Sequence, residues 1–313
     1  MEQVEERYIS LLTDFGFKRI FGSAPNKDLL ICFLNSLFNG KQVVKDVSYL
    51  NPEHVGDVYT DRRAIFDVYC EGENGEKFIV EMQNAYQTYF KDRSLFYSTF
   101  PIREQAPKGD DWDFKLNHVY TVALLNFSMN DDAFEKEKIR HHVQLCDTAT
   151  HKVFYDKLEF IYVEIAKFDK KLDELQTLYE KWLYALKNLY KLSQRPKELC
   201  DKVFDRLFEE AEIAKFSPLE MREYEASKKA YRDIKNSVDT AKREGIAEGM
   251  EMGMKQGMEK GMKQGMKQGM EKGLEQRSLE IARKMLAKGM DAASVMEITG
   301  LSVEQMQQLK AEF

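Results

Sequence analysis

The chain of 313 residues has no apolar run approaching the ~18 residues that a membrane-spanning helix needs. Its first residues, Met-Glu-Gln-Val-Glu-Glu-Arg, lack the basic start of a secretory signal peptide. The four cysteines stand far apart, at positions 32, 70, 146 and 200, with no Cys-x-x-Cys pair, which favours unpaired thiols. We therefore expect a protein of the reducing cytoplasm that has no membrane partner.

Several signature motifs of enzymes are also absent. The chain has no G-x-S-x-G of serine hydrolases, no G-x-x-x-x-G-K-[ST] of P-loop proteins and no G-x-G-x-x-G of Rossmann folds. An excess of basic charge is missing too, because the net charge is −6. Any contact with nucleic acid must therefore come from a local basic patch or through a bridging metal ion.

What the chain does contain is a stretch from 65 to 83 that predicts a β-hairpin. Two short runs of β-branched and aromatic residues flank the turn Gly-Glu-Asn-Gly. Side chains alternate between the two faces of a strand, so the face opposite to Asp67 is expected to hold Phe66, Val68 and Cys70. On the second strand Glu81 and Gln83 share a face.

A hairpin that closes symmetrically about Asn74 places Asp67 opposite Glu81, with Cβ atoms about 4.5–5.5 Å apart. Two carboxylates this close repel each other unless a cation lies between them, and oxygen ligands suit Mg²⁺. An acid on one strand and Glu81-x-Gln83 on the next is therefore a candidate metal site. The alternative is that both acids are ordinary exposed residues of a strand.

This spacing resembles the PD-(D/E)xK nuclease signature, with Gln83 in the position of the lysine. The surrounding segments are similar to the Rpn family of recombination-promoting nucleases and transposases, a bacterial branch of that superfamily. The resemblance covers roughly residues 8–165. It rests on T-D-F-G-F-K-R-I-F-G at 13–22, L-N at 34–35, N-P-E at 51–53 and R-S-L-F-Y-S-T-F-P-I-R-E-Q at 93–105.

The resemblance implies a metal-dependent DNA endonuclease that hydrolyses phosphodiester bonds in recombination or mobile-element processes. It implies Mg²⁺ or Mn²⁺ held by Asp67, Glu81 and the main-chain carbonyl of Met82. Gln83 can orient a water molecule through its amide, but it carries no charge and cannot act as a general base, which departs from the usual lysine. The alternative is a catalytically weak or inactive nuclease fold that serves as an oligomeric module binding DNA or protein.

Two further candidates lie on a helix expected from 8 to 22, where Asp14 and Lys18 are four residues apart and share one face. The resemblance implies that the acid of this D-x-x-F-K element lies near the catalytic pair, so Asp14 is a third catalytic candidate. A solvated helix acid is the alternative. Lys18 is a candidate for contact with a DNA phosphate, or it pairs with Asp14.

Arg93 and Tyr97 are also candidates for DNA binding. They lie one turn apart on a crossover helix expected from 86 to 105, and helix-surface packing is the alternative for both. The polar loop from 51 to 63 adds acids at positions 57 and 61 that could tune the site, although loop residues are more often simply solvated.

The order of the predicted elements is that of an α/β protein with a restriction-endonuclease-like PD-(D/E)xK core, a mixed sheet flanked by helices. Pro101 is expected to end or kink the crossover helix. His141 and His142 are neighbours on a strand, so they face opposite ways and make a shared zinc ion improbable. The expected elements besides the hairpin are helices at 8–22, 27–38 and 86–105 and strands at 43–50, 117–127, 140–145, 152–155 and 159–166.

Beyond this domain, which we assign to residues 1–167, the hydrophobic period becomes that of helices. A helical appendage (168–243) is expected to comprise a helix from 169 to 189, one from Pro196 to about 216 and a charged one from 217 to about 243. A small helical cap (278–313) follows a glycine repeat. In this cap Gly289 is expected to end a helix, Asp291 to cap the next one, Thr299-Gly300-Leu301 to form a turn, and Ser302 with Gln305 to form a capping box. The cap resembles a helix-turn-helix module, although its last helix has no arginine and plain helix packing is the alternative.

The glycine repeat (244–277) has a glycine at every fourth position from 245 to 273, followed from Gly249 onward by methionine or leucine. Each glycine costs about 1 kcal/mol relative to alanine in a helix, so eight cost about 8 kcal/mol. The segment is therefore either a flexible tether or a helix that packs closely against a partner. The methionine column favours the second interpretation, and we expect a homo-oligomer formed through this repeat.

Overall fold

The computed structural model describes residues 6–54, 64–106, 113–129 and 132–311. It divides into two compact units, residues 1–238 and 239–313, which we treat separately. None of the helices described is long and apolar enough to cross a membrane.

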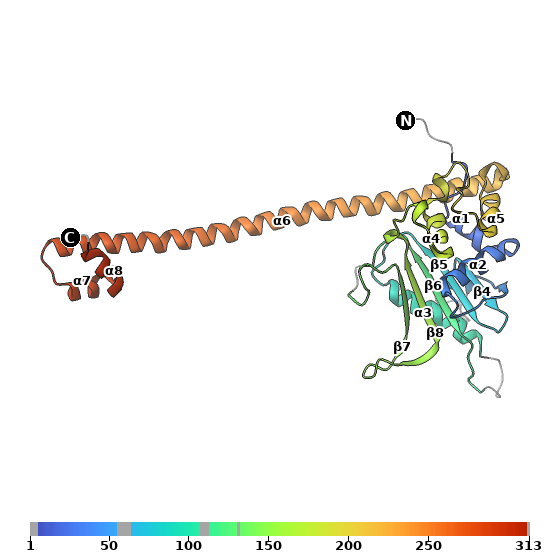
Figure 1. The fold of residues 1–313 in the computed structure, drawn as a ribbon, viewed down its shortest axis with the longest axis horizontal. Coiled ribbons are helices and arrows are strands. Elements are labelled where there is room, and N and C mark those ends of the chain that lie inside the picture. Colours follow the sequence, from blue (N-terminus) through green and yellow to red (C-terminus); the bar gives the residue numbers. More distant parts are fainter. Residues whose placement is uncertain (1–5, 55–63, 107–112, 130–131, 312–313) are drawn as a thin grey trace. The chain divides into compact units, whose positions relative to one another are not determined.

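The first unit is built around a mixed six-stranded sheet with the order β1-β4-β5-β6-β8-β7 (Figure 1). The pairs β1–β4, β4–β5 and β7–β8 are antiparallel, whereas β5, β6 and β8 run parallel. This confirms the predicted α/β class. The strands are β1 (Val47–Tyr49), β4 (Val68–Gly72), β5 (Lys77–Gln83), β6 (Val119–Leu125), β7 (Arg140–Cys146) and β8 (Val153–Glu164), and a separate pair is formed by β2 (Glu53–His54) and β3 (Ala64–Ile65).

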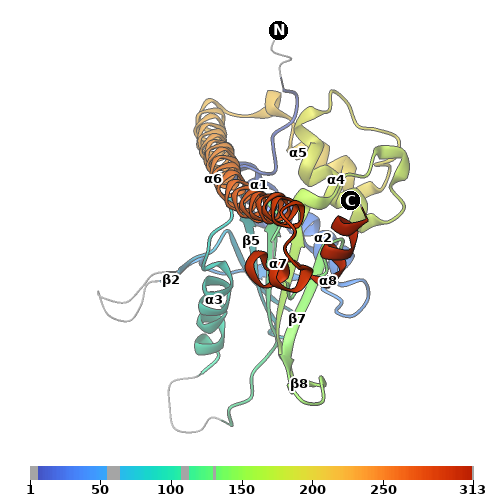
Figure 2. The same cartoon turned by 90° about the vertical axis from the view of Figure 1, so that its left-hand side faces the viewer.

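Helices cover both faces of this sheet. Figure 2 shows α3 (Phe90–Glu104) on one side and α2 (Lys27–Phe38) and α4 (Leu178–Asn188) on the other. Burial on both faces explains why all seven residues of β6 are buried, as the apolar run 117–127 predicts. The α2 side also carries α1 (Asp14–Phe21) and α5 (Lys202–Glu210).

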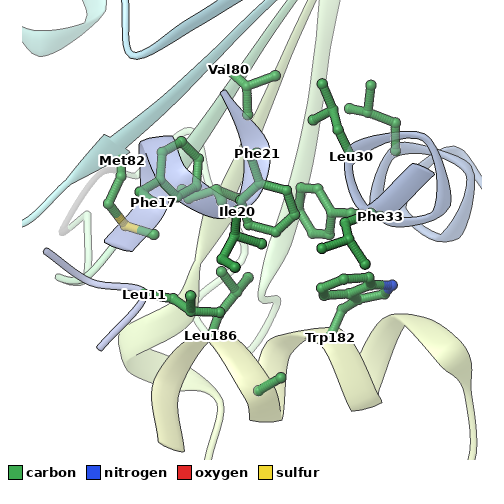
Figure 3. Packing of buried hydrophobic residues seen from close by; sticks show 14 of the residues in the cluster. Leu11, Phe17, Ile20, Phe21, Leu30, Phe33, Val80, Met82, Trp182 and Leu186 are labelled. Atoms are coloured by element: carbon green, nitrogen blue, oxygen red, sulfur yellow. The ribbon is translucent and has the colours of Figure 1, made fainter. Parts of the chain in front are cut away.

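The main core lies between β5 and the helices α1, α2 and α4 (Figure 3). Val80 and Met82 point from the sheet toward α1, and Trp182 of α4 closes the layer from below. The indole of Trp182 lies 5.7 Å from the ring of Phe21 and 5.9 Å from that of Phe33. The helix that carries Asp14 and Lys18 is thus held against β5 by buried aromatic side chains.

The helix predicted from 8 to 22 begins only at Asp14, so the prediction is wrong for residues 8–13. These residues are extended because they pair with a distant segment: the amide of Ile9 donates to the carbonyl of Ala211, and Tyr8 forms a β-bridge with Glu212. The side chain of Thr13 then caps the helix by accepting a hydrogen bond from the amide of Gly16 at 3.1 Å.

Replacing the fully buried Thr13 with alanine is therefore expected to lower the free energy of unfolding by about 1–2 kcal/mol. Its hydroxyl also donates to the carbonyl of Ser10 at 2.7 Å, so the substitution removes both bonds. Urea denaturation measures the change. Thr13→Ser, which keeps the hydroxyl, is the matched control, and an equal loss in both variants would contradict the capping role.

Other predicted elements differ at their ends for identifiable reasons. The strand predicted at 43–50 is reduced to β1, because Val44 exchanges two 2.8 Å hydrogen bonds with the side chain of Asn35 rather than with a strand. Pro101 lies inside α3 without ending it. The strands predicted at 152–155 and 159–166 are a single strand, β8, whose first part extends beyond β6 and pairs with β7 past a bulge.

In the helical region α4 begins at Leu178, where Thr177 and Glu180 form a capping box, rather than at 169. The helix predicted from Pro196 to about 216 is the shorter α5. The helix predicted to end near 243 continues instead as α6 (Pro218–Ala287) through the whole glycine repeat.

The second unit ends in two short helices, α7 (Ala292–Thr299) and α8 (Val303–Lys310), that pack on the end of α6. The stop predicted at Gly289 and the turn predicted at Gly300 are confirmed, since both glycines have positive φ and follow the ends of α6 and α7. The predicted caps at Asp291 and Ser302 are confirmed as well, the latter as a capping box with Gln305.

Candidate metal centre

The hairpin has the register predicted from its sequence. Val68 of β4 pairs with Val80 of β5, so the next position places Asp67 opposite Glu81. The amide of Met82 donates to Oδ2 of Asp67 at 2.8 Å, and the amide of Asp67 donates to Oε1 of Glu81 at 3.3 Å. These two main-chain bonds fix both carboxylates side by side at the carboxyl end of β5.

Asp67 itself lies just before β4, at a bend in the chain. Because of this bend, Phe66 does not share a face with Val68 and Cys70, and that part of the prediction is wrong. The ring of Phe66 packs instead on the α3 side, 5.3 Å from Tyr69 and 5.2 Å from Tyr97. The bend separates β4 from β3, which pairs with β2.

The two carboxyl groups are largely withdrawn from solvent, with Glu81 6% exposed and the Asp67 side chain 21% exposed. Burial raises the pKa of Glu81 well above its ordinary value, and repulsion from Asp67 raises it further. Burial also raises the pKa of Asp67, against the opposing effects of the Met82 amide and the charge of Lys18. The pair therefore holds negative charge in a place that favours an added cation.

The structure brings Asp14 and Lys18 to this pair from α1. The Lys18 ammonium lies 2.6 Å from Oδ1 of Asp14 and 4.0 Å from Oδ1 of Asp67. Burial alone would lower the pKa of Lys18, but the hydrogen bond to Asp14 and the surrounding carboxylates raise it overall, so the side chain stays charged. Asp14 is the most exposed of the three acids and reaches Asp67 through Lys18.

Arg93 and Tyr97 lie on α3, which covers the face of β5 that carries Glu81. The charge of Arg93 opposes the rise in the pKa of both carboxyl groups without cancelling it. The Arg93 side chain donates a hydrogen bond to the side chain of Gln87 at 2.6 Å, and its guanidinium lies 5.6 Å from the centre of the Tyr97 ring. Burial raises the pKa of Tyr97, and the charge of Glu81 raises it further. Both residues therefore border the site without an ion pair to its carboxylates in the described chain.

Gln83 and Met82 take different positions around the pair. Gln83 follows on the same face as Glu81, and we find no hydrogen bond from its side chain to any residue that the structure describes. The side chain of Met82 is buried in the core, whereas its amide points toward Asp67. Because the N–H and C=O of one strand residue point the same way, the carbonyl of Met82 also lies on the Asp67 side.

These residues fit a hard divalent cation and no softer metal. Mg²⁺ is commonly bound by one or two carboxylates, with water and substrate phosphate oxygens completing its octahedron. Asp67, Glu81 and the Met82 carbonyl supply oxygen alone. Within residues 6–54, 64–106, 113–129 and 132–311 no cluster of three or more histidine, cysteine or acidic side chains is suited to a metal.

The histidine pair behaves as its alternation predicts. His141 bonds the fully buried Glu164 at 2.9 Å, whereas His142 bonds Glu159, so the two rings have different partners. The loop acids predicted to tune the site, Asp57 and Asp61, lie outside the described residues.

Sequence reasoning overlooked the polar residues that brace this end of the sheet. The side chain of Asn84, directly after β5, donates to the carbonyl of Leu12 at 2.7 Å. Asn126, directly after β6, donates to Asn84 at 3.3 Å and to the hydroxyl of Tyr231 at 3.2 Å. An asparagine after each of two neighbouring strands is the signal that could have revealed this network.

Comparison with known proteins gives two matches. A family model described as PD-(D/E)XK nuclease family transposase matches residues 11–241. A second model, described as the C-terminal HTH domain of the Rpn/YhgA-like nuclease family, matches residues 275–311. No curated protein and no solved structure matches the chain. The first match includes every candidate residue of the metal centre.

Proposed function

Because the chain belongs to the Rpn family of PD-(D/E)XK nuclease transposases, we propose that it is a DNA endonuclease that depends on Mg²⁺ or Mn²⁺. The observation that supports this proposal most directly is the buried pair Asp67 and Glu81, whose carboxylates accept hydrogen bonds from the main-chain amides of Met82 and Asp67 respectively. A buried pair of acids with raised pKa values is costly for a structural role, and it is suited to binding a divalent cation.

In the proposed reaction Asp67, Glu81 and the Met82 carbonyl hold the ion, with their geometry fixed before the substrate arrives. A bound Mg²⁺ supplies polarisation of a phosphoryl oxygen and a lowered pKa for an attacking water. The amide of Gln83, on the face of Glu81, is placed to orient that water but carries no charge. Arg93 and Tyr97 border the same face and are proposed to contact the DNA backbone.

DNA is the proposed partner of the second unit as well, through its helix-turn-helix domain. In α8 the amide of Gln305 is already engaged, since it caps the helix and donates to Glu275 at 2.7 Å. Gln307, Gln308 and Lys310 are exposed and remain as the polar side chains for a DNA groove. We further propose that the glycine repeat joins copies of the chain, and that the protein acts in the cytoplasm, where its four unpaired cysteines stay reduced.

The test is nicking of supercoiled plasmid by the full-length protein in Mg²⁺ or Mn²⁺, compared with Asp67→Ala. We expect cleavage by the wild type, none after chelation with EDTA, and a loss of at least about 100-fold in the variant, because one of two protein carboxylates is removed. Asp173→Ala, which removes an exposed acid from the same unit, is the control and should cleave normally.

Calorimetric titration with Mn²⁺ separates the proposal from its alternative, a nuclease fold that binds without cutting. Metal binding that depends on Asp67, together with cleavage, supports an enzyme. Binding of DNA without metal uptake or cleavage would favour the binding module. Cleavage that is equal in wild type and Asp67→Ala would exclude this site.

A further inference from the structure

The candidate metal centre has no positively charged side chain at position 83, where the PD-(D/E)xK motif usually has a lysine. Gln83 follows Glu81 on the same face and brings no charge. Phosphodiester hydrolysis builds negative charge on the phosphate in the transition state, and a fixed cation nearby stabilises it. The question is therefore which side chain of this protein supplies that charge.

Lys18 is the candidate that the distances select. Among the residues that the structure describes, no other lysine, arginine or histidine lies within 4.0 Å of Asp67 or Glu81. Its ammonium comes from α1, on the opposite layer from α3, and it is 41% exposed, so it can reach a bound phosphate. Arg93 is the competitor, but its guanidinium donates to Gln87 and lies over aromatic rings.

Several contacts keep this lysine in place. Asp14 holds the ammonium at 2.6 Å, one helical turn away. Phe17, next to Lys18, is fully buried in the core and fixes the rotation of α1. The amide of Phe15 donates to the Ser227 hydroxyl at 3.0 Å, which ties the start of α1 to α6. Lys18 is thus a pre-positioned charge rather than a freely moving surface lysine.

We propose that Lys18, presented by α1 and held by Asp14, supplies the positive charge at the scissile phosphate that residue 83 does not provide. The proposal rests on the proposed nuclease function and extends it to a named residue and its holder. Lys18 acts as a fixed charge and transfers no proton. Asp14 is then a positioning residue that contacts Lys18 and not the metal ion.

The cleavage test moves the charge from one element to another. Lys18→Ala is expected to slow plasmid nicking by about 100-fold, as for the loss of one transition-state hydrogen-bond donor. Gln83→Lys alone is expected to raise the activity, because it adds a second positive charge beside the scissile phosphate. The double variant Lys18→Ala/Gln83→Lys is expected to recover to within about tenfold of the wild type, because a lysine again faces the phosphate from the neighbouring element. Lys27→Ala, which removes a half-exposed lysine paired with Asp46, is the control.

A second measurement does not require cleavage. The Lys18 ammonium lies 4.0 Å from a proposed metal ligand, so it opposes the binding of another cation. Calorimetric titration with Mn²⁺ is expected to show about tenfold tighter binding to Lys18→Ala than to the wild type, with Lys27→Ala unchanged. Asp14→Asn frees the ammonium from its holder and is expected to slow cleavage with little change in thermal stability, because Asp14 is exposed.

Three results would overturn the proposal. The first is normal cleavage by Lys18→Ala. The second is failure of the double variant to recover while Gln83→Lys alone stays active, which would mean that Lys18 has a structural role. The third is an unchanged Mn²⁺ affinity in Lys18→Ala. If the wild type itself does not cut DNA, the nuclease proposal fails, and the metal titration still decides whether Lys18 contributes its charge to the site.

Discussion

Glu81→Gln is expected to stabilise the metal-free protein and at the same time to abolish the proposed cleavage of DNA. Glutamine has nearly the same shape and keeps an oxygen to accept the hydrogen bond from the amide of Asp67. The substitution removes the carboxyl group of Glu81, whose pKa is raised by its burial and further by repulsion from Asp67. A pKa shift of one unit corresponds to about 1.4 kcal/mol, so a gain of about 1–2 kcal/mol in the free energy of unfolding is expected. Thermal and urea unfolding in EDTA measure it.

The same pair makes the stability of the metal-free wild type depend on pH. A carboxyl group whose pKa is raised in the folded state binds its proton more tightly there than in the unfolded chain. Its stabilising contribution is therefore full at low pH and is lost as the pH rises above the ordinary value of 4.5. Glu81→Gln should remove this loss, and a variant with the same pH profile as the wild type would contradict the repulsion.

A bound metal ion is expected to make the wild type more stable than Glu81→Gln, which reverses their order in EDTA. Binding to the folded state alone adds about 2.7 kcal/mol at a concentration 100 times the dissociation constant. Saturating Mn²⁺ should therefore raise the melting temperature of the wild type, and it should leave Glu81→Gln almost unchanged. An equal metal-induced rise in both proteins would show that the ion binds elsewhere.

The glycine repeat is expected to be helical only when it packs against another copy of itself. In α6 the methionines from Met250 to Met270 are 61–77% exposed, and a Cβ added at any of the eight glycines of the repeat would meet nothing within 4 Å. The apolar column and the open glycine positions thus have no partner in the described chain. Burial of a methionine contributes roughly 1.5–3 kcal/mol, so five or six of them can offset roughly 8 kcal/mol of glycine cost.

Light scattering and circular dichroism on residues 241–313 across a concentration series test this expectation, with helicity and mass rising together. Replacing Met258, Met262 and Met266 with glutamine should prevent association and lower the helicity at every concentration. Replacing Gly257, Gly261 and Gly265 with alanine should instead separate the two quantities, because alanine favours a helix but fills the groove that a partner backbone needs. A monomer that stays helical at low micromolar concentration would refute the idea, and so would a multimer that forms without gaining helix.

The parts of the site that could be predicted from sequence depend on neighbours in the chain. Alternation and a symmetrical turn were sufficient to place Asp67 opposite Glu81, and a four-residue spacing paired Asp14 with Lys18. Glycines with positive φ and serine or aspartate caps marked the last helices for the same reason. In each case the deciding interaction spans only a few residues or a short hairpin.

The wrong predictions depend on partners far away in sequence. The start of α1 is set by hydrogen bonding of Ile9 to Ala211, which no local pattern reveals. The placement of Phe66 follows from the α3 aromatic cluster and from the bend at Asp67. The continuity of β8 depends on β7 as a partner beyond the end of β6. Local periodicity could not show that these long-range contacts outweigh it.

The attachment of α1 to the beginning of α6 has a consequence for how the protein folds during its synthesis on the ribosome. The hydroxyl of Tyr224 accepts a hydrogen bond from the amide of Ser10, and Arg19 pairs with Glu220. The helix that carries Lys18 therefore receives its last supports from residues synthesised about 200 positions later. Domains form as units during synthesis, N-terminal parts first. A nascent chain that ends before α6 thus has both acids of the candidate metal centre but lacks these contacts to α1, which delays complete assembly of the candidate site until the beginning of α6 has been synthesised.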